Sequence, residues 1–125
     1  MRSHKLGRAG ENLAARHLER RGWRIVERNV RFGHREIDLI AAKGDVIAFV
    51  EVKARASAEF GHPLAAITHR KRQEIRTVAS EWLRRARPGA VTLRFDAVSV
   101  LFRENKPPLI EHVEDAWRIT QRFGR

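Results

Sequence analysis

The apolar residues of the chain recur at two different spacings, and these spacings divide it into helices and strands. Near the N-terminus they follow the period of a helix, which is predicted over Gly7–Arg21 and ends at Gly22. A longer amphipathic helix is predicted from Pro63 to about Arg87, with Pro88-Gly89 ending it. The apolar positions of this second helix are 64, 67, 75, 78, 79, 82, 83 and 86.

The remaining apolar segments are short and rich in β-branched residues, as is typical of strands. Strands are predicted over Trp23–Asn29, Glu36–Ala42, Val46–Lys53, Val91–Phe102 and Leu109–Val113. Loops are predicted at Arg31–Arg35 and Ala54–His62, and Asp115 is expected to cap a short last helix over Ala116–Arg122. This order predicts an α/β fold with a mixed central sheet flanked by helices, in a single domain over residues 1–125.

Composition narrows the class of protein. The chain has no cysteine, which excludes disulfides and thiolate metal sites. It contains no run of 18 apolar residues, and its N-terminus is basic without the apolar segment of a signal peptide. We therefore expect a cytoplasmic location and no membrane span.

The charge balance points to a partner. Lys and Arg total 26 against 15 Asp and Glu, a net charge of +11. A chain this basic repels itself unless a polyanion or screening salt is nearby, and nucleic acid, most simply DNA, is the expected partner. A membrane surface is the competing partner, but no basic amphipathic segment with Trp, Phe and Leu on one face stands out.

Acidic residues interrupt two of the predicted strands. Gly44-Asp45 suits a two-residue hairpin turn of type II′, which would set Lys43 opposite Val46. By the same register Asp38 would face Glu51, and Glu36 would face Lys53. Strict alternation puts these four side chains on one face with Ile40 and Phe49, and gives the other face to Ile37, Leu39, Val50 and Val52.

Two carboxylates that face each other across half-buried strands repel or share a proton. A divalent cation between Asp38 and Glu51 removes this difficulty, and Mg²⁺ or Mn²⁺ suits oxygen ligands. Lys53, two residues beyond Glu51, would then contact a water or a phosphate oxygen, an arrangement suited to phosphodiester hydrolysis. The alternative is a solvated sheet face with ordinary cross-strand ion pairs.

Asp38, a hairpin and Glu51-Val52-Lys53 together resemble the PD-(D/E)xK signature of nucleases. Longer motifs resemble the YraN-like family of small bacterial proteins and extend over most of the chain. They are GxxGExxAxxxL at 7–18, RNVR at 28–31, EIDLIA at 36–41, FVEVKAR at 49–55, Lys71 in the second helix and RFDAVSV at 94–100. One departure is Arg35, where the family usually has Gly.

The resemblance implies a restriction-endonuclease-like αβββαβ core, similar to archaeal Holliday-junction resolvases. It also implies that Glu11 faces the metal site as a third carboxylate. The alternative for Glu11 is a charge that complements the dipole of the first helix. Asp96, in an apolar strand, is expected to be structural, and the three tryptophans are expected in the core.

Four basic residues are candidates for contacts with nucleic acid. Lys71 lies on the apolar stripe of the second helix, where it either contacts phosphate or extends to solvent. Arg31 and Arg55 flank the predicted strands and could hold neighbouring phosphates, although either could equally be a solvated surface residue. Arg35 adds charge beside the acidic pair.

These features predict a Mg²⁺- or Mn²⁺-dependent endonuclease that hydrolyses phosphodiester bonds in DNA, including branched or structured DNA. Asp38 and Glu51 would hold the metal with help from Glu11, and Lys53 would serve the attacking water or the transition state. Two alternatives remain: a non-catalytic nucleic-acid-binding module of the same fold, and a subunit that needs a partner for activity. Both a homodimer and a protein partner are compatible with the sequence.

Overall fold

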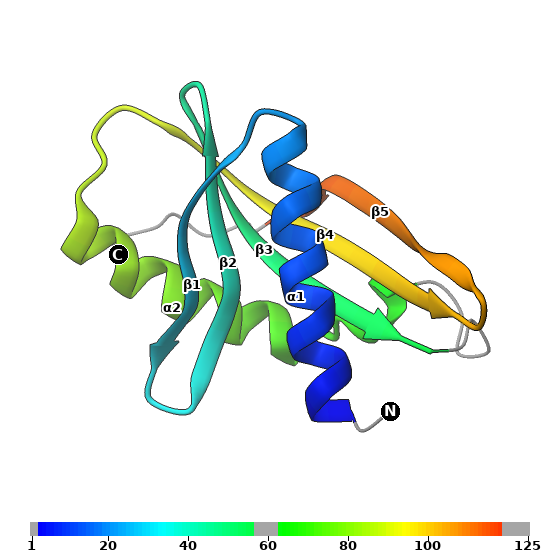
Figure 1. Ribbon diagram of the computed structural model, residues 1–125. Coiled ribbons are helices and arrows are strands. Elements are labelled where there is room, and N and C mark those ends of the chain that lie inside the picture. The colour runs from blue at the N-terminus through cyan, green and yellow to red at the C-terminus, as the bar shows by residue number, and fades with distance from the viewer. Residues whose placement is uncertain (1–2, 57–62, 119–125) are drawn as a thin grey trace.

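The computed structural model describes residues 3–56 and 63–118. A five-stranded mixed sheet is flanked by one long helix on each face (Figure 1). The elements in chain order are α1 (Ser3–Arg20), β1 (Arg24–Phe32), β2 (Arg35–Lys43), β3 (Val46–Arg55), the 3₁₀ helix η1 (Pro63–Ala66), α2 (His69–Ala86), β4 (Thr92–Arg103) and β5 (Lys106–Trp117). This arrangement confirms the predicted α/β fold.

The strands lie in their chain order across the sheet, β1-β2-β3-β4-β5. All neighbours are antiparallel except β3 and β4, which are parallel. A parallel pair needs a crossover connection, and α2 supplies it. The sheet is therefore mixed, as the pattern of strands and helices predicts.

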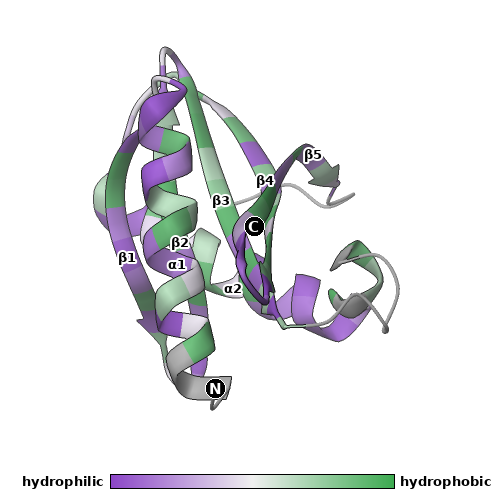
Figure 2. Ribbon diagram, turned by 45° about the vertical axis from the view of Figure 1, so that its right-hand side comes forward, coloured by the Kyte–Doolittle hydropathy of each residue, from purple (hydrophilic) through white to green (hydrophobic). Residues whose placement is uncertain are grey.

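Each face of the sheet has its own core. On the α2 face, Phe49 contacts the rings of Trp82 and Phe95 at centroid distances of 5.9 and 5.5 Å. On the α1 face, Leu18 is buried in a second cluster with Leu39. Figure 2 shows the difference between the strands: β1 at the sheet edge is mainly hydrophilic, whereas the central β3 is largely hydrophobic. All three tryptophans are buried, as predicted.

The hairpin between β2 and β3 has the predicted register. Lys43 pairs with Val46, and the pairing continues to Leu39 opposite Val50. Gly44 has a φ of 60°, the left-handed conformation that a type II′ turn requires at its first central position. The turn thus fixes which residues of the two strands come opposite each other.

The second helix is divided, contrary to the prediction of one helix from Pro63 to Arg87. The 3₁₀ helix η1 comes first, and Thr68 then caps α2 by accepting a hydrogen bond from the Lys71 backbone N–H at 3.1 Å. A threonine side chain that accepts the backbone N–H of the third residue after it is a helix N-cap. It therefore favours the start of a new helix over continuation of the preceding one.

Other predicted boundaries are also corrected. The loop predicted at 31–35 comprises only residues 33–34, because the flanking residues belong to β1 and β2. The first two residues of the loop predicted at 54–62 belong to β3. The last helix does not begin at residue 116, because β5 continues to Trp117; Asp115 instead has a φ of 51° and donates its N–H to Asp96 Oδ1 at 3.0 Å. Residues 57–62 and 119–122 of these predictions lie outside the described residues. Among the helices that are described, none is both long and apolar enough to cross a membrane.

Candidate active site

The candidate site lies where β2 and β3 stop pairing. Their regular pairing runs from the hairpin turn to Leu39 opposite Val50. One residue further, the Asp38 side chain accepts the backbone N–H of Val52 through Oδ2 at 2.8 Å. The Asp38 carboxylate therefore accepts a backbone N–H of β3, as a carbonyl of β2 would in a regular ladder. This hydrogen bond holds the Asp38 side chain between the two strands.

The structure brings Asp38 and Glu51 together. Their side chains lie within hydrogen-bonding reach, and Glu51 is only 4% exposed. Burial and then the charge of Glu51 raise the pKa of Asp38 to about 8. Burial also raises the pKa of Glu51, against the opposing effect of Lys71. Near neutral pH the pair therefore retains a proton, held mainly at Asp38.

Two lysines converge on one oxygen of Glu51. The Nζ atoms of Lys53 on β3 and Lys71 on α2 each lie 3.8 Å from Glu51 Oε2. The other oxygen, Oε1, is buried and has no hydrogen-bond donor among the described residues when both acids are ionised. A buried carboxylate oxygen without a donor, facing a second carboxylate, fits a hard divalent cation such as Mg²⁺ or Mn²⁺.

Asp38 also belongs to a second group of acids. Carboxylate oxygens of Glu11, Glu36 and Asp38 lie within 4.8 Å of one another, around a cavity of about 430 Å³. Glu11 comes from α1, and burial raises its pKa, with further contributions from the charges of Asp38 and Glu36. Helix α1 thus places Glu11 beside Asp38, where the resemblance implied a third carboxylate.

Two further residues hold this acidic group. Asn29 Nδ2 donates to Glu11 Oε2 at 3.0 Å and to Glu36 Oε1 at 3.2 Å. Arg31 Nε pairs with Glu36 Oε2 at 2.8 Å. Neither Asn29 nor Glu36 was predicted as a site residue. The available signals were their places in the RNVR and EIDLIA motifs.

The strict alternation of faces predicted for β2 is wrong. Ile37 lies in the α2-side core with Ile40, whereas Leu39 lies in the α1-side core. The predicted pairing of Glu36 with Lys53 is also absent, since Glu36 contacts Arg31 and Asn29. Regular pairing of β2 with β3 ends at Leu39, and beside this part of β2 the backbone of Asn29 in β1 has a φ of 51°.

The four basic candidates lie at different distances from the acids. Lys71 and Arg31 border them directly, through Glu51 and Glu36. Arg55 is half-buried at the end of β3, two residues after Lys53, and Arg35 begins β2 opposite Phe32 at the tip of the hairpin. Lys71 and Arg31 therefore adjoin the acidic group.

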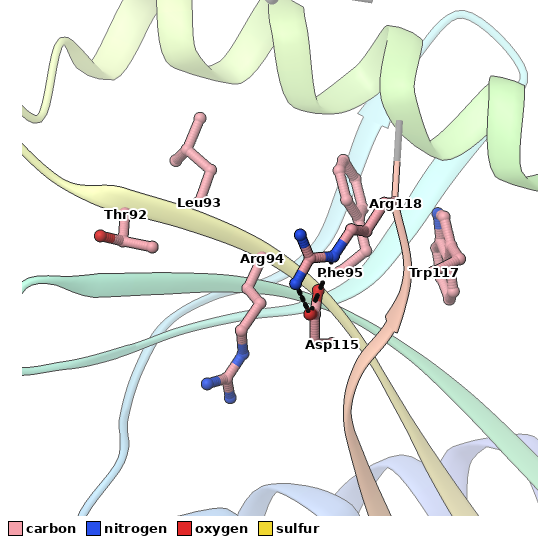
Figure 3. Close-up of a pocket in the computed structure, with 7 residues that line it drawn as sticks. All are labelled: Thr92, Leu93, Arg94, Phe95, Asp115, Trp117 and Arg118. Carbon is pink, nitrogen blue, oxygen red and sulfur yellow. Dashed lines mark hydrogen bonds and ion pairs between the residues drawn. The ribbon is translucent and has the colours of Figure 1, made fainter. Parts of the chain in front are cut away.

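A second cavity, of about 310 Å³, lies at the other end of the sheet (Figure 3). In it Asp115 forms an ion pair with Arg118 at 2.8 Å, and Arg94 points away toward Asp96. Asp96 is fully buried and accepts from Arg94 and the Asp115 backbone, and it contacts His112 at 2.8 Å. These contacts join β4 to β5 and agree with the structural role expected for Asp96.

Comparison with known proteins gives the family. The model of "Uncharacterised protein family UPF0102" matches residues 10–100, which contain every acid, lysine and arginine of the candidate site. The chain belongs to this family. The UPF0102 match includes Glu11 on α1 and extends beyond the β3–β4 crossover, so the match covers the elements that form the site.

UPF0102 relatives from distant bacteria match nearly the whole chain. A UPF0102 protein of Rhodococcus opacus is 46% identical over 112 residues, 90% of this chain and 95% of its own. One of Chlorobaculum tepidum is 42% identical over 119 residues, covering 91% and 92%, and one of Geobacter metallireducens is 40% identical over 119 residues, covering 95% and 97%. The names of these relatives give the family and state no activity.

Proposed function

We propose that this UPF0102 chain is a divalent-cation-dependent endonuclease that hydrolyses phosphodiester bonds in DNA. The observation that carries the proposal is the environment of Glu51. Its carboxylate faces Asp38 and is almost completely buried, with two lysines beside one oxygen. When both acids are ionised, the other oxygen has no donor among the described residues. A purely structural acid in this position would have its oxygens satisfied by donors.

The side chains divide the work of the reaction. Asp38 and Glu51 hold Mg²⁺ or Mn²⁺, and Glu11 assists from α1. When bound, such an ion polarises a phosphoryl oxygen and makes a water more acidic. Lys53 orients the attacking water and stabilises the charge that builds on the phosphoryl group. The water oxygen forms a bond to phosphorus, the ester P–O bond breaks, and the leaving oxygen takes up a proton.

The charge of the molecule supports nucleic acid as the substrate. A net charge of +11 attracts a polyanion strongly at moderate salt. Arg31 and Lys71 adjoin the acids, and Arg35 and Arg55, at the start of β2 and the end of β3, would hold phosphates further along a strand. These contacts bring a phosphodiester to an acidic site that would otherwise repel it.

The test is a cleavage assay with the purified full chain on linear, flapped and four-way DNA, with Mn²⁺, Mg²⁺ or EDTA. We expect cleavage only with a divalent ion. Lys53→Ala is expected to lower the rate by at least about 10²-fold, and Asp38→Asn to abolish it. Lys106→Ala, a matched loss of one lysine at the exposed start of β5, is expected to cleave like the wild type.

Two outcomes would count against the proposal. Equal cleavage by the wild type, Asp38→Asn and Lys53→Ala would indicate a contaminating nuclease. Salt-sensitive DNA binding by the wild type without cleavage, in any divalent ion and with cell lysate added back, would favour the non-catalytic binding module.

A further inference from the structure

Asn29 has an unusual backbone conformation for a residue inside a strand. Its φ is 51°, between the paired residues Arg28 and Val30 of β1. Non-glycine residues rarely adopt this region, and asparagine tolerates it better than most. The conformation turns the Asn29 side chain toward the cavity that also contains Glu11, Glu36 and Asp38.

The Asn29 amide connects two acids from different elements. Its single nitrogen donates one hydrogen to Glu11 on α1, at 3.0 Å, and one to Glu36 on β2, at 3.2 Å. Ionised carboxylates only accept hydrogen bonds, so the amide nitrogen, and not its oxygen, must face them. An amide in this position offsets the repulsion between two carboxylates that lie within 4.8 Å of each other and of Asp38.

The two acids depend on this amide to different degrees. Glu36 keeps a second partner, because Arg31 pairs with its other oxygen at 2.8 Å. Glu11 accepts its hydrogen bond from Asn29, and it lies on the partly exposed surface of α1. Without the amide, repulsion from Glu36 and Asp38 favours rotation of Glu11 toward solvent. Loss of Asn29 should therefore act mainly through Glu11.

We propose that Asn29 is a positioning residue of the cation site: its amide holds Glu11 and Glu36 together so that Glu11 faces Asp38. This inference rests on the proposed function for the existence of the site. It goes beyond that function by assigning a role to Asn29 and by adding Glu36 to the acids around the cation. Residues that orient metal ligands in this way commonly change metal affinity by about 10–100-fold.

The test measures Mn²⁺ affinity by titration calorimetry on the full chain. Asn29→Gly keeps the left-handed backbone without strain and removes the amide. It is expected to weaken Mn²⁺ binding by about 10–100-fold while retaining cooperative thermal unfolding in EDTA.

A double-mutant cycle tests the route through Glu11. Glu11→Gln and Asn29→Gly are each expected to weaken Mn²⁺ binding, and the combination should weaken it no more than the stronger single change. Asn12→Ala is the matched control, because Asn12 follows Glu11 on α1 and accepts from Arg28 at 2.7 Å outside the cavity. Its Mn²⁺ affinity should equal that of the wild type.

The outcomes separate this inference from the proposed function. Wild-type Mn²⁺ affinity in Asn29→Gly would overturn the positioning role, as would additive effects in the cycle. A wild type that binds Mn²⁺ but cleaves no DNA would overturn the proposed function, while weaker binding by the Asn29 variants would still support the positioning role. A wild type that binds no Mn²⁺ would overturn both.

Discussion

Asp38 has surroundings that oppose its ionisation. It is largely buried and Glu51 faces it, while the Val52 backbone N–H, which donates to it at 2.8 Å, and the charge of Lys71 favour its ionised form. Lys53 and Lys71 lie closer to Glu51 than to Asp38, so they assist Glu51 more than Asp38. The folded chain therefore keeps a proton on Asp38 at a pH where the unfolded chain has lost it.

This proton makes stability depend on pH in a definite direction. The Asp38 pKa rises from 3.8 in the unfolded chain to about 8 in the fold. The contribution is complete below pH 4 and is lost as pH rises toward 8, since the folded chain binds more protons over this range. In EDTA, Asp38→Asn should gain stability relative to the wild type between pH 5 and pH 8, by at most about 1.4 kcal/mol per pH unit.

Urea unfolding of both proteins at a series of pH values measures this difference. Asparagine can still accept the Val52 N–H, so the variant should fold. A constant difference in unfolding free energy between pH 5 and 8 would mean that Asp38 ionises normally in the fold.

At the scale of elements, the close approach of α1 to β3 decides where Glu11 lies. A Cβ on Gly10 would lie 2.6 Å from the Cβ of Ala54, closer than real Cβ atoms approach. Glycine at this position therefore lets the helix contact the strand directly. Because Glu11 is the next residue, the same contact sets its distance from the acids of β2.

Gly10→Ala tests this contact. Alanine favours a helix over glycine by up to about 1 kcal/mol, yet we expect Gly10→Ala to lower the unfolding free energy by about 1–3 kcal/mol through overpacking. Adding Ala54→Gly should restore most of the loss. Gly7→Ala is the control, because no atom lies within 4 Å of its Cβ position; it should be neutral or stabilising in the same denaturation experiment.

An equal gain in stability from Gly10→Ala and Gly7→Ala would show that α1 does not pack closely on β3.

The sequence predicted the elements better than their ends. Apolar spacing identified both helices and all five strands, because it reports which side chains are buried. It misassigned residues 116 and 117, which lie in β5. Next to them, the Asp115 backbone N–H donates to the side chain of Asp96, a buried residue of β4. A contact between residues 19 positions apart cannot be read from local spacing.

The part of the site that the sequence predicted is the part fixed by the register of the β2–β3 hairpin. The turn at Gly44-Asp45 fixes the register that brings Asp38 to Glu51, and motif resemblance added Glu11. Glu36 was missed because the assignment of faces assumed strict alternation, which β2 breaks between Ile37 and Leu39. Asn29 was missed because its positive φ, which accompanies its contacts with the acids, cannot be read from the spacing of apolar residues.

At the scale of the whole molecule, one acidic site lies in a chain with a net charge of +11. α1 and α2 lie on opposite faces of the sheet (Figure 1); α1 supplies Glu11 and α2 supplies Lys71, to a site where the pairing of β2 with β3 ends. In the proposed function, the basic residues around this site let a polyanion approach acids that alone would repel it.

DNA affinity should therefore depend strongly on salt. We expect the logarithm of the binding constant to fall linearly with the logarithm of salt concentration, measured by fluorescence anisotropy in EDTA. Lys71→Ala should reduce the magnitude of the slope by about 1, as for one lost phosphate contact, and Lys106→Ala should leave it unchanged. A slope near zero in the wild type would contradict a role for the net charge in binding.

The central claim is that Asp38 and Glu51 share a divalent cation. A crystal structure of the full chain with Mn²⁺, with anomalous diffraction data, tests it most directly. The account predicts an anomalous peak at bonding distance, about 2.0–2.3 Å, from a carboxylate oxygen of each acid, and loss of that peak in Asp38→Asn. Mn²⁺ found only elsewhere on the molecule, with the two acids still in contact through a proton, would contradict it.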